Sequence, residues 1–291
     1  MSVWLPTAPC TPEECATHHG SVSGPAVMGL RLLTGLAAVT VGVLLAPVAA
    51  LLGRLFGTVF RHRLTRCWSR AVLRAFGVRV RVRVIGVPHD RRAALVVANH
   101  ISWLDIPLVA AVLPGRMLAK SEVRGWPVLG PLAALGGTLF VERDRLRTLP
   151  GTVASMAAAL RGGARVVVFP EGSTWCGRGQ GPFRHAAFQA ALDAGAAVQP
   201  VHITYLPTGA AAFVGDDPLL ASLRRVAAAG GLTAEIRLLP PILPGAFPDR
   251  RSLARAAQLA VARESANRPS PSVHQCVRSM PTSASSLRTP S

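Results

Sequence analysis

The sequence predicts an α/β protein with a single mixed or mostly parallel sheet flanked by helices, preceded by an N-terminal membrane-anchoring helix or hairpin. Three observations support this prediction. Short runs rich in β-branched residues alternate with runs rich in Ala and Leu, as in α/β domains. Half of the 291 residues are apolar, which is enough for a sizeable core. Residues 32–53 are uncharged and largely apolar, and about 20 such residues span a bilayer as a helix.

The first 27 residues differ in composition from the rest of the chain. They contain no Lys or Arg and several Pro, Ser and Thr residues, so we expect residues 1–27 to be disordered. An alternative is that they precede the true start of the protein. Met28 stands just before Arg31 and the apolar run, which is a natural beginning for a membrane anchor.

We expect residues 28–57 to anchor the chain to the membrane. Glu13 and Glu14 are the only charged residues before Arg31, whereas arginines come soon after the apolar run, at Arg54, Arg61, Arg63, Arg66 and Arg70. By the positive-inside rule this asymmetry places the C-terminal bulk of the chain at the cytoplasmic face of the cell membrane. Pro47 could interrupt the helix, so a re-entrant or interfacial hairpin remains an alternative to a full crossing. A secretory signal fits less well, because its apolar region is usually about 7–15 residues.

We expect residues 58–264 to form the catalytic domain and residues 265–291, rich in Ser, Pro and Arg, to be a disordered tail. The expected strands are Val78–Ile85, Leu95–Ala98, Thr138–Val141, Arg165–Phe169, Val198–Ile203 and Ala234–Leu239. The expected helices lie near 104–113, 127–135, 147–161, 184–194, 217–229 and 252–264.

The net charge of +18 would attract polyanions, either an anionic lipid surface or nucleic acid. The chain has no dense basic run with interleaved aromatics, no zinc-finger spacing and no RNA-binding signature. We therefore expect membrane lipids as partners and no nucleic acid.

The cysteines are odd in number and scattered, at Cys10, Cys15, Cys67, Cys176 and Cys276. Without a C-x-x-C pair they indicate neither a disulfide framework nor a zinc site, so we expect unpaired thiols in a reducing compartment and no metal.

Polar residues gather where the predicted strands end. The run ALVVA leads into NHISWLD at residues 99–105, TLFV leads into Glu142-Arg143, and RVVVF leads into PEGST at residues 170–174. The strand at 198–203 carries Pro200 and His202. Because ligands in open α/β sheets bind beyond the carboxyl ends of the strands, these four segments are expected to meet at one rim.

His100 and Asp105 are the candidate catalytic pair. If His100 lies in the turn after the strand and Asp105 in the first turn of the next helix, the carboxylate can reach back to the imidazole Nδ1–H. The Nε2 atom is then free to act as a base, and the nucleophile would be the hydroxyl of the substrate. The alternative is that His100 is a capping or core histidine without a chemical role.

The segment NHISWLD resembles the first signature block of the glycerolipid acyltransferases, the family of 1-acylglycerol-3-phosphate acyltransferases. Lys120-x-Glu122 followed by GTLFVER at residues 137–143 resembles the second block. FPEGS at residues 169–173 resembles the third, and VQPV at residues 198–201 the fourth. The resemblance covers roughly residues 80–205, and its specificity comes from four blocks in the right order.

The resemblance implies that His100 is the general base and Asp105 its orienting partner. It implies substrate-binding roles for Asn99, Ser102, Lys120, Arg143, Glu171, Gly172 and Ser173. Arg143 could clamp a phosphate through its guanidinium, or form an ordinary surface salt bridge with Glu142 or Asp144. Gly172 permits close approach to a ligand or simply forms a turn. Lys120 could contact phosphate or the thioester carrier, or stand in solvent.

One departure concerns the acceptor. The third block usually continues with arginine, but Thr174 stands here, and Arg178 or Arg184 could take the place of that cation. Acyltransferases that act on lyso-ornithine lipid look similar in this segment.

The resemblance therefore implies transfer of a fatty acyl group from acyl-CoA or acyl-acyl-carrier-protein, with no bound cofactor, to the free hydroxyl of a lyso-lipid. The expected acceptor is 1-acylglycerol-3-phosphate, which becomes phosphatidic acid in phospholipid biosynthesis. The alternative is lyso-ornithine lipid or another lyso-lipid without phosphate. A more distant alternative is a non-catalytic basic protein of the membrane surface.

Overall fold

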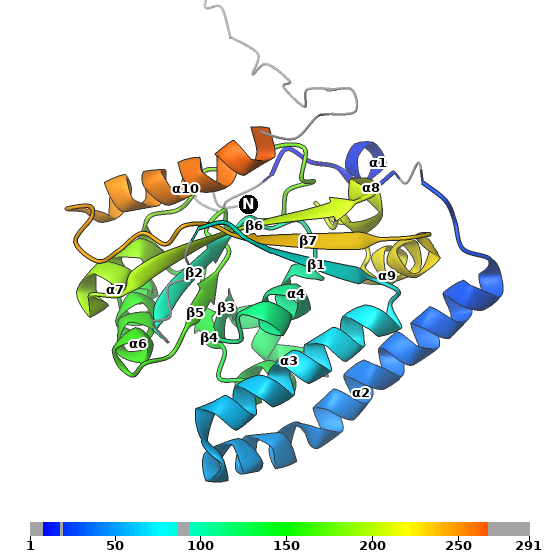
Figure 1. Ribbon diagram of the computed structural model, residues 1–291, viewed down its shortest axis with the longest axis horizontal. Helices are drawn as coiled ribbons and strands as arrows, with labels where there is room; N and C mark the ends of the chain where they lie inside the picture. The colour runs from blue at the N-terminus through cyan, green and yellow to red at the C-terminus, as the bar shows by residue number, and fades with distance from the viewer. Residues whose placement is uncertain (1–7, 18–19, 87–92, 128, 267–291) are drawn as a thin grey trace, which may run out of the picture.

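A seven-stranded mixed sheet forms the centre of the computed structural model, which describes residues 8–17, 20–86, 93–127 and 129–266 (Figure 1). The strands, in spatial order, are β1 (Arg79–Val84), β7 (Thr233–Leu238), β6 (Ala197–Leu206), β2 (Ala94–Ala98), β5 (Val166–Val168), β3 (Arg116–Lys120) and β4 (Leu139–Val141). β6 and β7 pair antiparallel, and the other described pairs are parallel. The predicted fold class is confirmed.

Strand β2 lies between β5 and β6, and all five of its residues are buried. A parallel strand covered on both faces is apolar throughout, which explains the uninterrupted ALVVA run. Because β2 to β6 run in one direction, their carboxyl ends meet at the same edge of the sheet. This edge is the rim at which the polar segments were expected to converge.

Helices cover both faces of the sheet. The apolar cores of the two faces contain different helices. The helices on one face are α3 (Gly57–Ala75), α4 (Asp105–Val112), α8 (Thr208–Ala211) and α9 (Leu219–Ala228). Those on the other face are α6 (Leu149–Arg161), α7 (Ala186–Ala194) and α10 (Arg250–Ala266). The short elements η1 (Ser121–Gly125), α5 (Leu129–Leu135) and η2 (Leu146–Thr148) connect β3 to α6 around β4.

The predicted strands and helices of the domain are present with small shifts of their ends. Strand β3 and helix α3 were missed, as were the short elements η1 and α8. Strand β3 lies near the edge of the sheet; four of its residues are only partly buried and Lys120 is exposed, so the strand lacks the apolar run of β2. Helix α3 carries the arginines that looked like the flank of a membrane anchor. Strand β6 also extends beyond the predicted end at Ile203 to Leu206.

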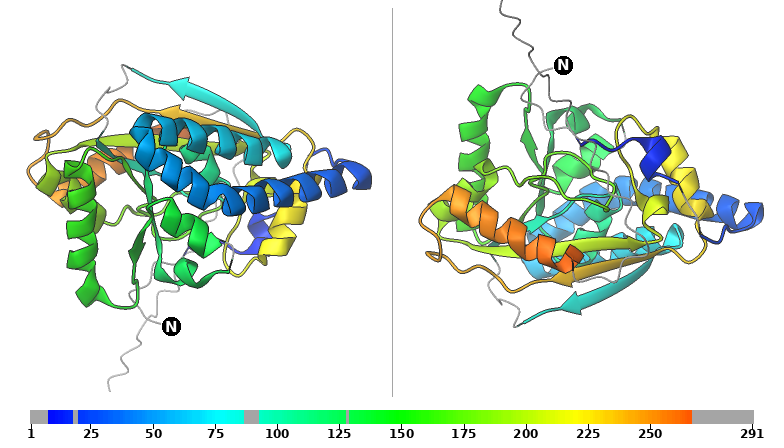
Figure 2. Two further views of the ribbon diagram at one scale, coloured as in Figure 1. Left: turned by 90° about the horizontal axis from the view of Figure 1, so that it is seen from below. Right: turned by 90° about the horizontal axis from the view of Figure 1, so that it is seen from above.

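Helix α2 (Pro25–Leu55) is the one helix of the described chain that is long and apolar enough to cross a bilayer. It does not stand alone, because α3 runs back beside it (Figures 1 and 2). A Cβ atom on Gly35 would collide with the Phe76 ring, and one on Gly42 would collide with the Trp68 ring. Glycine at these positions therefore permits α2 to pack closely against α3 and against Phe76, the residue that follows α3. Pro47 does not interrupt α2, which runs unbroken from Pro25 to Leu55. The hairpin is therefore made by α2 and α3, and not by the break at Pro47 that the sequence had left open as an alternative.

The expectation that residues 1–27 are disordered is wrong for the part that the structure describes. Residues 8–17 include helix α1 (Pro12–Cys15) and bury Cys10 and Cys15. Farther along, the Ser23 N–H donates to the Ala228 carbonyl oxygen. Small buried side chains and backbone hydrogen bonds hold this segment, and neither produces an apolar period in the sequence. Of the predicted tail at 265–291, residues from 267 onward lie outside the described chain.

Candidate active site

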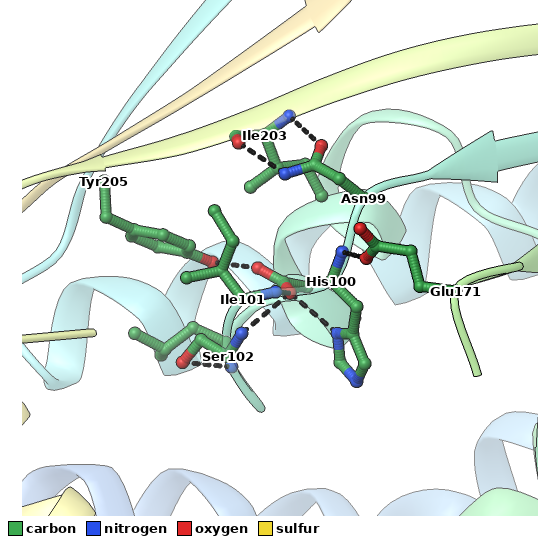
Figure 3. A network of polar contacts seen from close by, with 9 residues as sticks. Asn99, His100, Ile101, Ser102, Glu171, Ile203 and Tyr205 are labelled. Carbon is green, nitrogen blue, oxygen red and sulfur yellow. Dashed lines mark hydrogen bonds and ion pairs between the residues drawn. The ribbon is translucent and has the colours of Figure 1, made fainter. Parts of the chain in front are cut away.

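His100 and Asp105 meet as the sequence predicted. His100 comes after β2, Asp105 begins α4, and His100 Nδ1 lies 2.8 Å from Asp105 Oδ2 (Figure 3). The Asp105 side chain is fully buried, whereas 20% of the His100 side chain is exposed. Pro107 falls in the first turn of α4, where its missing N–H costs no helical hydrogen bond. The loop thus joins a buried carboxylate to an imidazole that reaches solvent.

Three further donors hold the Asp105 carboxylate. Oδ2 also accepts the backbone N–H groups of Ile101 at 2.7 Å and Ser102 at 2.9 Å, and Oδ1 accepts the Tyr205 hydroxyl at 2.6 Å. A carboxylate surrounded by donors accepts the His100 Nδ1–H, which assigns the imidazole tautomer. His100 Nε2 therefore carries the lone pair that a base needs. It points away from this network and has no hydrogen-bond partner in the described chain (Figure 3).

Residues that follow the neighbouring strand β5 hold both the ring and the main chain of His100. The ring stacks on Phe169, with centroids 4.2 Å apart and planes 18° from parallel. The His100 N–H donates to Glu171 Oε2 at 2.7 Å, and its carbonyl oxygen accepts the Trp175 N–H at 2.7 Å. The third block therefore positions the first.

Glu171 binds backbone groups with both carboxyl oxygens, because Oε1 accepts the Gly181 N–H at 2.9 Å. Burial raises the pKa of Glu171 to about 8, and the two N–H donors offset that rise in part. At neutral pH its neutral form is favoured, so Asp105 does not share the site with a second ionised carboxylate. Glu171 therefore holds the backbone at His100 and at Gly181, and its contact with substrate stays a prediction.

Arg143 joins the second block to the third. Its Nη1 donates to the Gly172 carbonyl oxygen, and Gly172 adopts a φ of 76°, which favours glycine. Burial lowers the pKa of Arg143 from its usual value, and the nearby Glu122 charge opposes this. Among the described residues, Arg143 forms no salt bridge with Glu142 or Asp144. Glu142 pairs with Arg145 instead, with Oε2 3.8 Å from Nη1.

Two of the predicted substrate-binding side chains make hydrogen bonds within the protein. The Asn99 side-chain amide exchanges two hydrogen bonds with the Ile203 backbone, at 2.9 and 2.8 Å. Ser102 is fully buried, and its Oγ accepts the Leu104 N–H at 3.2 Å. Both side chains fasten the loop to its surroundings. Their polar atoms satisfy buried backbone groups, which would otherwise be costly to leave without partners.

The remaining predicted residues lie around the same rim. Lys120 ends β3 and is exposed. The Ser173 Oγ atom is buried and has no hydrogen-bond partner within the part of the chain that the structure describes. Of the two arginines considered as replacements for the missing cation, Arg184 is exposed and Arg178 donates to the Glu14 carbonyl oxygen. Ser173 thus carries a buried polar atom whose hydrogen-bonding capacity is unused within the described chain.

Tyr205 is the site residue that the sequence prediction missed. It lies on β6, two residues beyond the predicted strand end at Ile203, and is fully buried. The alternation of Val201, Ile203 and Tyr205 toward one core is the signal that could have extended the strand. His202 points to the other face, where its Nε2 lies 3.0 Å from Ser265 Oγ, so it takes no part in the rim.

Comparisons with known proteins show which family and which proteins this chain resembles. The family model described as Acyltransferase matches residues 79–204. Lyso-ornithine lipid O-acyltransferase of Pseudomonas aeruginosa is 41% identical over 243 residues, which cover 80% of this chain and 91% of that protein. The 1-acyl-sn-glycerol-3-phosphate acyltransferase of Neisseria meningitidis serogroup B is 39% identical over 145 residues, covering 50% and 56%. The crystal structure of the 1-acyl-sn-glycerophosphate (LPA) acyltransferase PlsC from Thermotoga maritima has a similar fold, with a TM-score of 0.51 and 24% identity over 81% of this chain and 96% of that chain.

Proposed function

This chain belongs to the acyltransferase family and is an O-acyltransferase, and we propose that it moves a fatty acyl group from an acyl thioester to the free hydroxyl of a lyso-lipid through His100. The single observation that carries the proposal is the imidazole held by Asp105 at 2.8 Å, with Nε2 unengaged in the described chain. This is the arrangement of a general base whose nucleophile comes from the substrate.

In the proposed reaction, the lyso-lipid hydroxyl gives its proton to His100 Nε2 as its oxygen attacks the thioester carbonyl carbon. The tetrahedral intermediate then breaks its carbon–sulfur bond, and the departing thiolate takes the proton from the imidazolium. The products are the acylated lipid and the free thiol of coenzyme A or acyl carrier protein. Asp105 stabilises the imidazolium in between.

The developing oxyanion needs a hydrogen-bond donor. The N–H groups of Ile101 and Ser102 are occupied by Asp105, and the Gly172 N–H donates to the Phe169 carbonyl oxygen. The Ser173 hydroxyl is buried, lacks a partner in the described chain, and comes directly after Gly172. We assign the donor role to this hydroxyl. Ser173→Ala should lower kcat, and Ser173→Thr should restore it.

For the acceptor, we favour lyso-ornithine lipid over 1-acylglycerol-3-phosphate. Arg143 is already engaged with Gly172, and Thr174 stands where the family usually has arginine. A doubly charged phosphate would therefore meet less cationic charge than the family arrangement offers. The relatives from Pseudomonas aeruginosa and Brucella abortus, of which the matches cover 91% and 80%, are lyso-ornithine lipid O-acyltransferases. The phosphate acceptor remains the second candidate, supported by exposed Lys120 at the same rim.

Membrane association is supported by α2, which exposes many leucine and valine side chains along its length. We propose that the hairpin of α2 and α3 lies in the interface of the cytoplasmic leaflet. The arginines of α3 would then meet anionic headgroups while the apolar side of α2 enters the acyl region. In this orientation the rim would lie next to its lipid substrate.

The test is a competition assay with the full chain purified in detergent, offered equal amounts of lyso-ornithine lipid and lysophosphatidate with one acyl thioester. Preferential acylation of lyso-ornithine lipid is the expected result. Preference for lysophosphatidate would overturn the acceptor assignment while leaving the chemistry intact. In the same assay His100→Ala should lose a factor of about 100 to 10,000, the usual contribution of a general base. Wild-type turnover by His100→Ala would overturn the mechanism.

A further inference from the structure

Three cysteines that are far apart in the sequence meet beside the active-site loop. The sulfur atoms of Cys10, Cys15 and Cys176 lie within 4.8 Å of one another. All three residues are buried, at 5%, 1% and 2% exposure, and none is in a disulfide. Cys10 and Cys15 come from the N-terminal segment, residues 8–17, and Cys176 comes from the loop after Glu171. The cysteine spacing had indicated no zinc site, because it could not reveal this long-range contact.

The geometry suits a thiophilic metal ion. A Zn–S bond of about 2.3 Å in a tetrahedral site separates neighbouring sulfur atoms by roughly 3.8 Å. Sulfur atoms already within 4.8 Å of one another need shift by only about an ångström to reach that spacing. Three thiolates select Zn²⁺ over the oxygen-seeking ions Mg²⁺ and Ca²⁺. They leave one position of the tetrahedron for a further ligand.

Simple packing accounts poorly for how closely the N-terminal segment is bound. Its apolar cluster is small, consisting of the three cysteines with Ala212 and Val214, plus Ala8 and Trp175 at the edge. Its backbone nevertheless approaches the domain so closely that a Cβ on Gly209 would collide with the Thr17 carbonyl oxygen. A metal ion would add a strong link to a short segment that has little apolar contact to offset its ordering entropy.

We propose that Cys10, Cys15 and Cys176 form a structural site for a thiophilic metal ion, Zn²⁺ by ligand preference, which fastens the N-terminal segment to the loop carrying Glu171. That loop also holds the catalytic histidine, because the Trp175 N–H donates to the His100 carbonyl oxygen. Loss of the ion should therefore loosen His100 indirectly. The site binds no substrate, and its existence does not depend on which lipid is the acceptor.

The experiment measures metal in the full chain, purified in detergent without chelator from cells grown with zinc. Mass spectrometry of the metal should find about one Zn²⁺ per chain. The triple variant Cys10→Ser/Cys15→Ser/Cys176→Ser should lose it. Cys67→Ser is the matched control, because Cys67 is exposed and lies outside the cluster, and it should keep the metal. Metal content equal in wild type and the triple variant would overturn the proposal.

A second measurement uses wild-type protein alone, so that it does not rely on the folding of the serine variants. After zinc is removed with a chelator, Co²⁺ is added and the absorption spectrum recorded. Sulfur-to-cobalt charge-transfer bands and tetrahedral ligand-field bands, both abolished by adding Zn²⁺, are the expected result. Absence of these bands would refute the site. So would a disulfide within the cluster, detected as two missing thiols in the denatured, metal-free chain.

Discussion

Replacing Asp105 with asparagine would separate the charge of the carboxylate from its hydrogen bonds. Two backbone donors, the N–H groups of Ile101 and Ser102, point at the oxygen that also accepts from His100. They would keep the oxygen of the new amide in that position. The amide NH2 would then face Tyr205, whose hydroxyl can rotate and accept. Asp105→Asn is therefore expected to preserve the loop and the Nδ1–H tautomer while removing the negative charge.

The cost can be worked from the geometry. With Nδ1 and Oδ2 2.8 Å apart, the charge centres of an imidazolium and a carboxylate are about 4 Å apart, where their attraction is about 4 kcal/mol at an effective dielectric constant near 20. Because about 1.4 kcal/mol corresponds to a tenfold change in rate, kcat should fall about a thousandfold. In serine proteases the same substitution costs about ten-thousandfold because it imposes the wrong tautomer. A smaller loss is expected here.

The assay monitors release of free thiol from the acyl thioester at saturating lyso-lipid, with the melting temperature recorded for each variant. Asp217→Asn is a suitable control, since Asp217 is also buried but pairs with Arg225 at 2.6 Å instead of a catalytic group. It should lose stability and keep kcat. If folded Asp105→Asn retained more than about a tenth of wild-type kcat, corresponding to less than about 1.4 kcal/mol, the electrostatic account would be refuted.

Three further perturbations test the surroundings of the site. Tyr205→Phe removes a buried hydrogen bond to a carboxylate and should lower the free energy of unfolding by about 1.5–3 kcal/mol in thermal denaturation; an unchanged melting temperature would contradict the contact. Because burial raises the pKa of Glu171 from 4.5 to about 8, its folded form holds a proton that the unfolded chain releases, so stability falls as pH rises between these values. In Glu171→Gln the pH–stability curve should lack that slope, and curves parallel to wild type would argue against the shift. Gly42→Leu should destabilise by about 1–3 kcal/mol by forcing Trp68 away from α2. Gly29→Leu, with nothing within 4 Å of its Cβ, should not destabilise, because leucine is the better helix former. Equal losses in the two variants would argue against close packing of α2 and α3.

Local signals account for the features that the sequence predicted correctly. Strand β2 is a purely apolar run followed by polar Asn99, so the sequence indicates both that the strand is present and where it ends. His100 and Asp105 belong to one loop, and a strand-to-helix turn suffices to bring them together. Glu171 likewise lies soon after a buried strand. In each case a few adjacent residues contain the information.

The features that the sequence did not reveal depend on long-range contacts. In the sequence, Tyr205 only continues an alternation of apolar residues. Its hydroxyl reaches Asp105 because β6 pairs with β2 in the sheet, and the sequence does not show that pairing. Helix α3 was hidden because its arginines resembled a membrane flank, whereas its buried side, with Val72 and Leu73, packs into the core. The cysteine cluster needs the N-terminal segment to fold back onto the domain.

The separate signature blocks are physically one network centred on the loop of His100. The third block holds this loop through the N–H and C=O groups of His100, and β6 holds it through the Asn99 amide. The second block reaches it indirectly, because Arg143 binds Gly172 in the third. In the proposed mechanism His100 must be held to within about half an ångström of its productive position, so the hydrogen bonds that fix this short loop would matter to the chemistry as much as the imidazole does. Substitutions of the residues that form these hydrogen bonds should therefore lower kcat more than they raise KM, because they would displace the imidazole without removing a contact to the lipid.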